Sequence, residues 1–220
     1  CKDILRTISN AGLGVDVVSI GELKTALSVN FPSKNIIFHG NNKSYKDLQF
    51  AIENKVGLIV IDAITEIDDV DKIASNLGVC QNVLIRVNPG VEAHTHHYIQ
   101  TATPDSKFGF SLKDDAFGAI KTCLSKNNIS LKGLHCHIGS QIFEEKSFVL
   151  ATTKMIEYYS FIKNELNVEF SILDIGGGFG IYYYEGDKKM VVNDYKNFVK
   201  IISTNVKQLV DKLNLKKPHL

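Results

Sequence analysis

Two short segments of the chain combine residue types that could bind a phosphate and a flat ring. The first is a glycine run, Gly176, Gly177 and Gly178, which directly follows an apolar stretch at residues 170–175. Because glycine lacks a Cβ atom, consecutive glycines can turn their N–H groups toward one centre and form an anion-binding nest. The alternative is a tight turn where two chain segments approach closely, and the glycines alone do not decide between the two.

The second segment runs from His135 through Cys136 and His137 to Ser140. In a strand, His135 and His137 share one face while Cys136 points to the other. Three interpretations are open: a metal-binding pair, a hydrogen-bonded pair in the core, or an imidazole that stacks on a planar cofactor while Ser140 donates to its phosphate. A metal site needs further ligands, and the strand that follows offers only Asp174, so we expect no metal.

Both segments lie at the ends of short apolar, β-branched runs that alternate with segments of helical period. The apolar runs predict six strands, at residues 15–18, 35–38, 58–61, 83–87, 131–135 and 170–175. The helical period predicts seven helices, at residues 3–10, 21–28, 45–54, 66–77, 113–126, 146–166 and 194–213. Ser44 and Thr65 are predicted N-caps, because each hydroxyl precedes a helical segment and can accept from its first-turn N–H groups.

The strands read as near-continuous apolar runs, which favours a parallel sheet covered by helices. A (β/α)8 TIM barrel has eight strands and typically ~250 residues. Here a helix comes first with no strand before it, and no strand is predicted after the last helix. We therefore predict an α/β fold in which residues 1–220 form one partial TIM-barrel domain, with strands 2–7 present and the first and last missing. An open doubly wound sheet is the alternative.

In a barrel, active sites lie at the carboxyl ends of the strands, and phosphate is commonly bound after the last strands. In the numbering of a complete barrel, Ser140 follows the sixth strand and Gly176 follows the seventh. A phosphate held between these neighbouring strand ends, beside a flat ring under His137, indicates pyridoxal phosphate. The longest irregular connection, residues 88–111, is over-long for a βα loop and is expected to be functional; it carries His94, His96, His97, Tyr98, Lys107 and Phe108.

The overall composition is that of an ordinary soluble globular protein. The chain has 220 residues, of which 44% are hydrophobic and 22% charged, and its net charge is +1 with no clustered basic stretch. This gives no indication of a nucleic-acid or membrane surface. The four scattered cysteines, Cys1, Cys80, Cys123 and Cys136, predict reduced thiols and a cytoplasmic setting.

Several motifs together resemble one enzyme family. HIGSQ at residues 137–141 and LDIGGGFG at residues 173–180 are similar to motifs of the alanine-racemase-type barrel decarboxylases, and among them of the diaminopimelate decarboxylases. Further support comes from GVDVVSIGEL (14–23), FHGNNKS (38–44), IRVNPGVEAHTHHYIQT (85–101) and SKFGF (106–110). The resemblance covers nearly the whole chain in the right order, and the motifs taken jointly are highly specific.

The resemblance implies a role for each matching residue. His137 resembles the histidine that stacks on the pyridine ring of the cofactor. Ser140 and the amides of Gly176, Gly177 and Gly178 resemble the phosphate grip. Arg86 matches an arginine near the cofactor, whose guanidinium suits anionic oxygens, although a structural ion pair is the alternative. Asp174 matches the aspartate before the glycines and is expected to order that loop.

Some features of the family are not in this chain. The resemblance places the Schiff-base lysine just upstream of Cys1, and the E-P-G-R segment and the C-terminal β-domain after Leu220. We therefore expect the 220 residues alone to be inactive. Lys43 or Lys107 could replace the lysine, but a Schiff-base lysine must be held and desolvated, so solvated or structural roles are expected. Ala102 stands where the family usually has Gly.

The resemblance also implies an activity. It predicts a pyridoxal-phosphate-dependent carboxy-lyase that converts the small amino acid meso-2,6-diaminopimelate to L-lysine and CO₂, as a homodimer when intact. Other barrel decarboxylases, acting on ornithine, arginine or carboxynorspermidine, are the alternative within the class. Outside this class, one alternative is a non-catalytic homologue that has lost the lysine and serves only in binding or regulation. Another alternative is a metal-dependent barrel hydrolase that uses His135 and His137.

Overall fold

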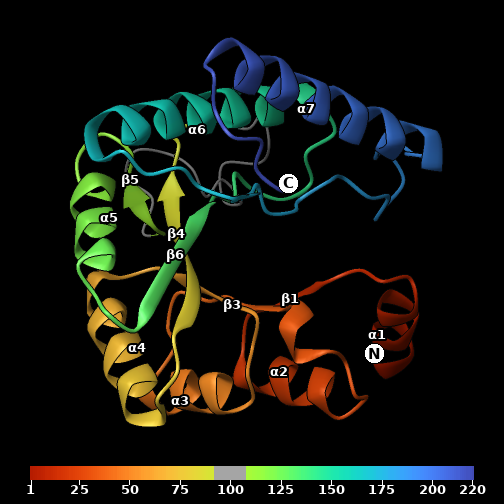
Figure 1. The fold of residues 1–220 in the computed structure, drawn as a ribbon. Helices are drawn as coiled ribbons and strands as arrows, with labels where there is room; N and C mark the ends of the chain where they lie inside the picture. The colour runs from red at the N-terminus through yellow and green to blue at the C-terminus, as the bar shows by residue number, and fades with distance from the viewer. Residues whose placement is uncertain (92–107) are drawn as a thin grey trace. The chain divides into compact units, whose positions relative to one another are not determined.

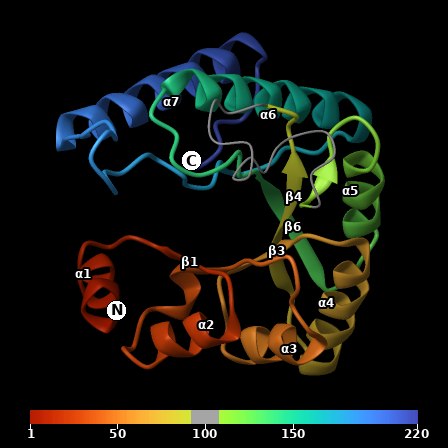
Figure 2. The same ribbon diagram turned by 180° about the vertical axis from the view of Figure 1, so that it is seen from behind.

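The computed structural model describes residues 1–91 and 108–220. The chain divides into two compact units: unit 1 holds residues 1–86 and 118–132, and unit 2 holds residues 87–117 and 133–220. The connection predicted at residues 88–111 is described only at its two ends, so His94, His96, His97, Tyr98, Lys107 and Ala102 lie outside the described residues. Figures 1 and 2 show the ribbon from opposite sides.

Six of the seven strands in the described chain occur where the apolar runs predict them. They are β1 (Val15–Val17), β2 (Ile36–Phe38), β3 (Leu58–Ile61), β4 (Gln81–Asn88), β5 (Phe110–Ser111), β6 (Ile129–His135) and β7 (Ile172–Asp174). The main sheet runs β1-β2-β3-β4-β6-β7, and β5 pairs with β4 beside this path. This order follows the chain without reversal, whereas a doubly wound sheet reverses at a switch point. The doubly wound alternative is therefore wrong.

Two details of the strands differ from the sequence prediction. The apolar runs do not predict β5, because two residues inside a long connection are too few to show a period. The chain after the last helix also reaches the sheet: His219 forms a parallel bridge with Ile172. His219 N–H donates to Ser171 O and Leu173 N–H donates to His219 O, both at 2.8 Å. The residues after α7 thus add one isolated parallel bridge beside β7.

Unit 1 has buried strands and amphipathic helices. Its helices are α1 (Lys2–Asn10), α2 (Ile20–Leu27), α3 (Tyr45–Glu53), α4 (Ile64–Leu77) and most of α5 (Ala116–Leu124). In both views α2, α3 and α4 lie along one side of the strands (Figures 1 and 2). Adjacent residues of β3 and β4 are buried in succession, as expected for parallel strands covered on both faces.

One of the two predicted helix caps in unit 1 is correct. Ser44 caps α3 through a capping box with Asp47, in which each side chain accepts from the other residue's N–H. The prediction for Thr65 is wrong, because α4 begins at Ile64 and Thr65 lies inside it. The N-cap is Ala63, so no side chain caps the helix, and Glu66 Oε2 accepts from the N–H of Asp62, just before the helix, at 2.8 Å.

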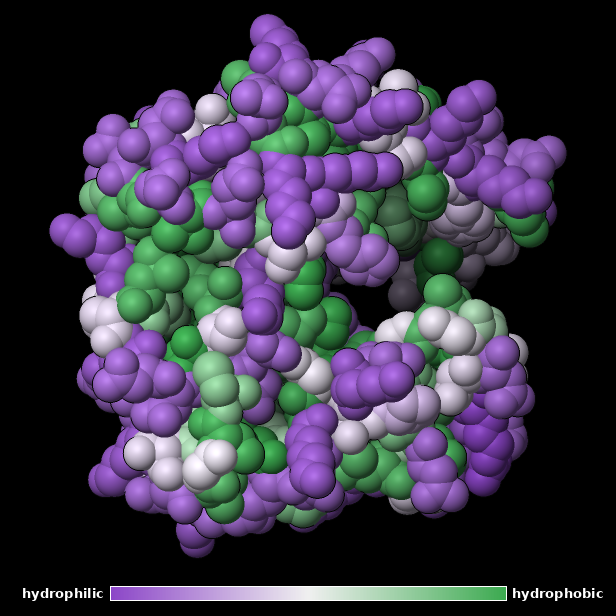
Figure 3. All heavy atoms as spheres, viewed as in Figure 1, coloured by the Kyte–Doolittle hydropathy of each residue, from purple (hydrophilic) through white to green (hydrophobic). Residues whose placement is uncertain are grey.

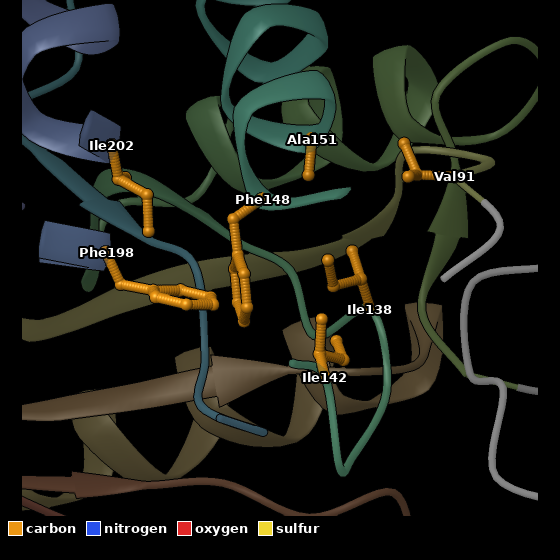
Figure 4. Close-up of a cluster of buried hydrophobic side chains, with 7 residues drawn as sticks. All are labelled: Val91, Ile138, Ile142, Phe148, Ala151, Phe198 and Ile202. Carbon is orange, nitrogen blue, oxygen red and sulfur yellow. The ribbon is translucent and has the colours of Figure 1, made fainter. Parts of the chain in front are cut away.

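Unit 2 is built on two long helices, α6 (Glu145–Leu166) and α7 (Val192–Lys212), which lie side by side in both ribbon views. Hydrophilic side chains cover most of the outer surface of α7 on the face drawn in Figure 3. Beneath the two helices, a cluster of seven buried side chains joins them to the segment after β6 (Figure 4): Val91, Ile138, Ile142, Phe148, Ala151, Phe198 and Ile202.

Two further predictions concern the whole chain. All four cysteines are free thiols, as predicted, and burial raises the pKa of Cys123 to about 12. In the described ranges, none of the helices has the length and apolar character needed to cross a bilayer.

Candidate cofactor site

Two loops of unit 2 contain most of the residues predicted to bind a cofactor. The histidine loop, residues 136–142, follows β6, and the glycine loop, residues 175–181, follows β7. β6 and β7 pair in parallel with His135 opposite Asp174, so both loops leave the same edge of the sheet. Cys136 N–H donates to Asp174 O at 2.8 Å and extends this pairing into the loops.

The histidine loop is anchored by apolar residues on either side of an exposed tip. Ile138 and Ile142 are buried in the cluster under α6 and α7, whereas Ser140 between them is exposed (Figure 4). Gly139 has a φ of +139° and Gln141 a φ of +57°, both in the region that glycine favours. The backbone therefore reverses sharply at this point. Ser140 is exposed at the turn, and the buried Ile138 and Ile142 hold the residues on either side of it in place.

The glycine loop needs glycine for steric reasons at two of its three positions. Gly176 and Gly178 have φ values of +67° and +101°. A Cβ on Gly178 would collide with Gly139 O, and one on Gly176 would lie 2.8 Å from Cys136 O. By contrast, a Cβ on Gly177 would meet nothing within 4 Å, and Gly177 is exposed. The two flanking glycines permit the close approach of the loops, and Gly177 faces open space.

The His137 ring lies against this glycine loop. A Cβ on Gly176 would lie 2.9 Å from His137 Nδ1, and one on Gly178 would lie 3.4 Å from His137 Cε1. His137 is half-buried, so part of it remains accessible. The structure thus brings His137 together with Gly176, Gly177 and Gly178, beside the loop that carries Ser140.

The donors of this region differ in availability. Gly176 N–H donates to Asp174 Oδ1 at 2.8 Å, which confirms that Asp174 orders the loop. Gly177 and Gly178 N–H donate to no acceptor among the described residues. Together with the exposed Ser140 hydroxyl they form a set of neutral donors around open space, which suits a phosphate. The residues present therefore fit the phosphate of pyridoxal phosphate.

Asp174 places a carboxylate against the glycine loop, where it accepts from Gly176 N–H. Its Oδ2 is buried and accepts no hydrogen bond from the residues that the structure describes. Burial raises the pKa of Asp174, and the hydrogen bond from Gly176 opposes this in part. Tyr159 of α6 links the two strands that precede the loops. Its hydroxyl donates to Ile172 O of β7 at 2.6 Å and accepts from Leu134 N–H of β6 at 2.9 Å.

Arg86 belongs to unit 1, where it is held in a buried ion pair. Its Nη1 lies 3.3 Å from Asp62 Oδ1, and both side chains are at most 7% exposed. The ion pair named as the alternative for Arg86 is thus present. A guanidinium has five donors, so it can bind an anion and a structural carboxylate at the same time.

Lys43 forms a second buried ion pair in unit 1. Its Nζ lies 2.9 Å from Glu66 Oε1, and its side chain is 2% exposed. Burial lowers the pKa of Lys43 and raises that of Glu66, and in each case the charge of the partner opposes the effect of burial. Lys43 therefore has a structural role and is not solvated. Lys107, the other candidate for a Schiff base, lies outside the described residues.

Sequence reasoning missed Asp62, Glu66 and Gln141. Asp62 directly follows β3, and Glu66 lies in the first turn of the next helix, α4. Their position just after the carboxyl end of a strand could have marked them as candidate site residues. In the sequence, Gln141 stands out only as the last residue of the HIGSQ motif. A group of three or more His, Cys, Asp or Glu side chains able to hold a metal is not found in the described ranges.

Comparison with known proteins identifies relatives over the whole chain. The family described as "Pyridoxal-dependent decarboxylase, pyridoxal binding domain" matches residues 1–218. The diaminopimelate decarboxylase of Bacillus methanolicus is 45% identical over 218 residues, which is 99% of this chain and 50% of that protein. That of Bacillus subtilis strain 168 is 43% identical over 193 residues, or 87% of this chain and 44% of that protein. The chain spans about half the length of these relatives.

Solved structures give the same result. The diaminopimelate decarboxylase of M. jannaschii in complex with L-lysine is 34% identical with a TM-score of 0.87, covering 100% of this chain and 49% of that chain. The diaminopimelate decarboxylase of Helicobacter pylori, also complexed with L-lysine, is 27% identical with a TM-score of 0.83. The match covers 94% of this chain and 51% of that chain. The predictions of an incomplete TIM barrel and of the decarboxylase family are confirmed.

Proposed function

Since this chain belongs to the family of pyridoxal-dependent decarboxylases, we propose that it is the cofactor-binding part of a diaminopimelate decarboxylase. The reaction removes CO₂ from meso-2,6-diaminopimelate and forms L-lysine. The observation that carries the proposal is the pair of loops after β6 and β7, whose exposed serine, open glycine amides and adjacent histidine match a phosphate and a ring. The identity to diaminopimelate decarboxylases, over 99% and 87% of this chain, supports the choice of substrate.

Pyridoxal phosphate, when bound, supplies an electron sink for the charge that remains after CO₂ leaves. Within this chain, we assign the phosphate to Ser140 and to the amides of Gly177 and Gly178. Gly176 belongs to the same phosphate site, but its N–H already donates to Asp174. Its role is therefore to allow the backbone turn that positions the amides of Gly177 and Gly178. His137 packs its ring against these glycines and would present its other face to the pyridine ring.

Arg86 is proposed as a further contact to an anionic oxygen of the cofactor. The support is its chemistry: Asp62 holds the guanidinium in one orientation, and a guanidinium can bind more than one partner at once. The Lys43–Glu66 pair gives this part of unit 1 a balanced charge, because two cations face two anions. The charge of Arg86 is therefore already balanced by Asp62, and its burial does not depend on an anionic group of the cofactor.

Three wider features are part of the same proposal. Residues 1–220 form part of a single barrel domain, the intact enzyme is a homodimer, and it acts in the cytoplasm. The domain assignment is supported by the consecutive strand order, and the cytoplasmic assignment by four free thiols. The homodimer rests on the family alone.

The direct test is an assay of the protein expressed from its complete coding sequence. Purified protein with pyridoxal phosphate should release CO₂ from meso-diaminopimelate, with L-lysine as the product identified by chromatography. Ornithine, arginine and carboxynorspermidine should react at least tenfold more slowly in kcat/KM. Faster turnover of one of these would move the protein to another decarboxylase, and cofactor binding without turnover of any would identify a binding homologue.

A further inference from the structure

We propose that Gln141 is a positioning residue that locks the two phosphate-binding loops together through its side-chain amide. The inference rests on the proposed function, since it assigns a role within the same site. Gln141 does not touch the open space in front of Gly177. It acts on the residues that do.

The evidence is a reciprocal pair of hydrogen bonds between the two loops. Gln141 Nε2 donates to Ile181 O at 2.9 Å, and Gln141 Oε1 accepts from Ile181 N–H at 2.9 Å. The side-chain amide thus uses one donor and its acceptor on the backbone of a residue 40 positions away. A peptide group of a neighbouring strand would make the same pair of contacts.

This pair continues a ladder that the backbone begins. Ile142 N–H donates to Gly178 O and Gly180 N–H donates to Ile142 O, each at 2.9 Å, around the bridge between Ile142 and Phe179. Gln141 then binds the next residue, Ile181. Four hydrogen bonds in succession therefore hold residues 178–181 against the histidine loop, and two of the four depend on one side chain.

The backbone conformation of Gln141 is one that glutamine seldom adopts, so its side chain must explain why glutamine is present. Its φ is +57°, a conformation in which asparagine and glycine are the common residues and most others cost about 1 kcal/mol or more. Three of the other non-glycine residues with positive φ in the described chain are Asn30, Asn167 and Asn214. Backbone preference would thus select asparagine or glycine, and the reach of the longer amide to Ile181 accounts for the glutamine.

The consequence for the site is a fixed distance between the Ser140 hydroxyl and the amides of Gly177 and Gly178. Ser140 directly precedes Gln141 in the histidine loop, and Gly178 begins the laddered stretch of the glycine loop. Without the amide pair, the hydrogen bonds that hold this part of the two loops together in the described chain are those of the Ile142 backbone, and Ser140 can move away from the glycine amides. Loss of Gln141 should therefore weaken the hold on the phosphate more than the hold on the ring.

The test compares pyridoxal phosphate with pyridoxal, which lacks the phosphate, on protein from the complete coding sequence. The wild type should bind pyridoxal phosphate more tightly, and Gln141→Met should reduce this preference about tenfold, as expected for two lost hydrogen bonds. Gln141→Glu, which keeps the acceptor for Ile181 N–H but loses the donor, should give an intermediate preference. Gln49→Met, which removes an amide that donates to Glu53 on α3, is the control and should behave as wild type.

The outcomes separate this inference from the proposed function. A wild type without preference for the phosphorylated ligand contradicts the proposed cofactor site itself. A wild-type preference that Gln141→Met leaves unchanged overturns the role of Gln141 alone. Should both variants fail to fold, hydrogen exchange on the wild type decides: the Ile181 amide must be protected to a similar degree as that of Gly180, and exchange at the rate of an open loop overturns the inference.

Discussion

In unit 2 the candidate phosphate site is built from backbone amides, a serine and one neutral side-chain amide, whereas unit 1 buries four charged side chains in two ion pairs. Lys43, Glu66, Asp62 and Arg86 come from the ends of three strands or the segments that follow them. The donors of the glycine loop come from adjacent residues of one segment. The arrangement in unit 2 depends on exact backbone conformation, and the arrangement in unit 1 depends on balanced charge.

The comparison shows where each region is vulnerable. A buried ion pair fails when one partner is removed, because the other charge then lacks compensation in an environment of low polarity. A backbone cradle fails when a Cβ atom enters it, even if no charge changes. Substitutions that remove a charge should therefore have their largest effect at the two ion pairs of unit 1, and substitutions that add only a Cβ atom should act on the two loops of unit 2.

The largest effect is expected from Lys43→Met, which leaves Glu66 as an unpaired buried carboxylate. We expect a loss of ~3–5 kcal/mol in the free energy of unfolding, measured by urea denaturation with circular dichroism. Combining Lys43→Met with Glu66→Gln should recover much of this loss. The neutral amide that replaces the carboxylate keeps an oxygen that can accept from Asp62 N–H, and it leaves no buried charge without a partner.

Lys163→Met is the control for Lys43→Met, since Lys163 pairs with Glu169 at 2.8 Å but both side chains are about a third exposed. It should cause a much smaller loss, because water already screens this pair. A double variant no more stable than Lys43→Met alone would contradict the charge-balance explanation.

A smaller but still substantial effect is expected from Gly178→Ala. The added Cβ would collide with Gly139 O in a conformation with a φ of +101°, so the two loops must separate. We expect roughly 3 kcal/mol of destabilisation by the same urea measurement. Gly177→Ala should change the free energy of unfolding by less than ~0.5 kcal/mol, because its Cβ meets nothing within 4 Å. Equal losses in the two variants would show that the loops are not packed as described.

The smallest effect concerns Asp174, the carboxylate under the glycine loop. Burial raises its pKa above the ordinary 3.8, so the folded state binds a proton more readily than the unfolded state. Stability should therefore fall as the pH rises from 3.8 through the raised pKa, by ~1.4 kcal/mol for each unit between the two pKa values. Asp174→Asn keeps an oxygen for Gly176 N–H and does not titrate.

The measurement for Asp174 is the difference in free energy of unfolding between the Asn variant and the wild type. This difference should rise in favour of the variant across the same pH range and then level off. Other carboxylates titrate equally in both proteins and cancel. A difference that stays constant from about pH 4 to about pH 7 would mean that the Asp174 carboxylate is not penalised by burial.

The same contrast explains how much the sequence could predict. The six predicted strands and seven predicted helices lie within a few residues of the observed ones, because each has its own hydrophobic period. That His137, Ser140 and the three glycines lie in neighbouring loops could be predicted because they belong to two contiguous motifs. The partners of Lys43 and Arg86 were not found, since Glu66 and Asp62 become their neighbours only through the pairing of strands.

Two differences from the sequence prediction have local physical causes. Residue type alone favours Thr65 as an N-cap, but α4 begins at Ile64, so Ala63 is the N-cap and Thr65 lies inside the helix. The position of Lys43 after a strand leaves solvated and structural roles open, and the charge of Glu66 makes it structural. Glu66 lies in the first turn of α4, where its two oxygens accept from Asp62 N–H and from the Lys43 ammonium group.

The most direct test of the central claim is the preference for pyridoxal phosphate over pyridoxal in protein from the complete coding sequence, measured for the wild type and Ser140→Ala. Ser140 is exposed beside the open glycine amides, so its hydroxyl should contact the phosphate alone. The account predicts that Ser140→Ala lowers the preference by about tenfold or more while the affinity for pyridoxal stays the same. An unchanged preference, or an equal loss for both ligands, would contradict it.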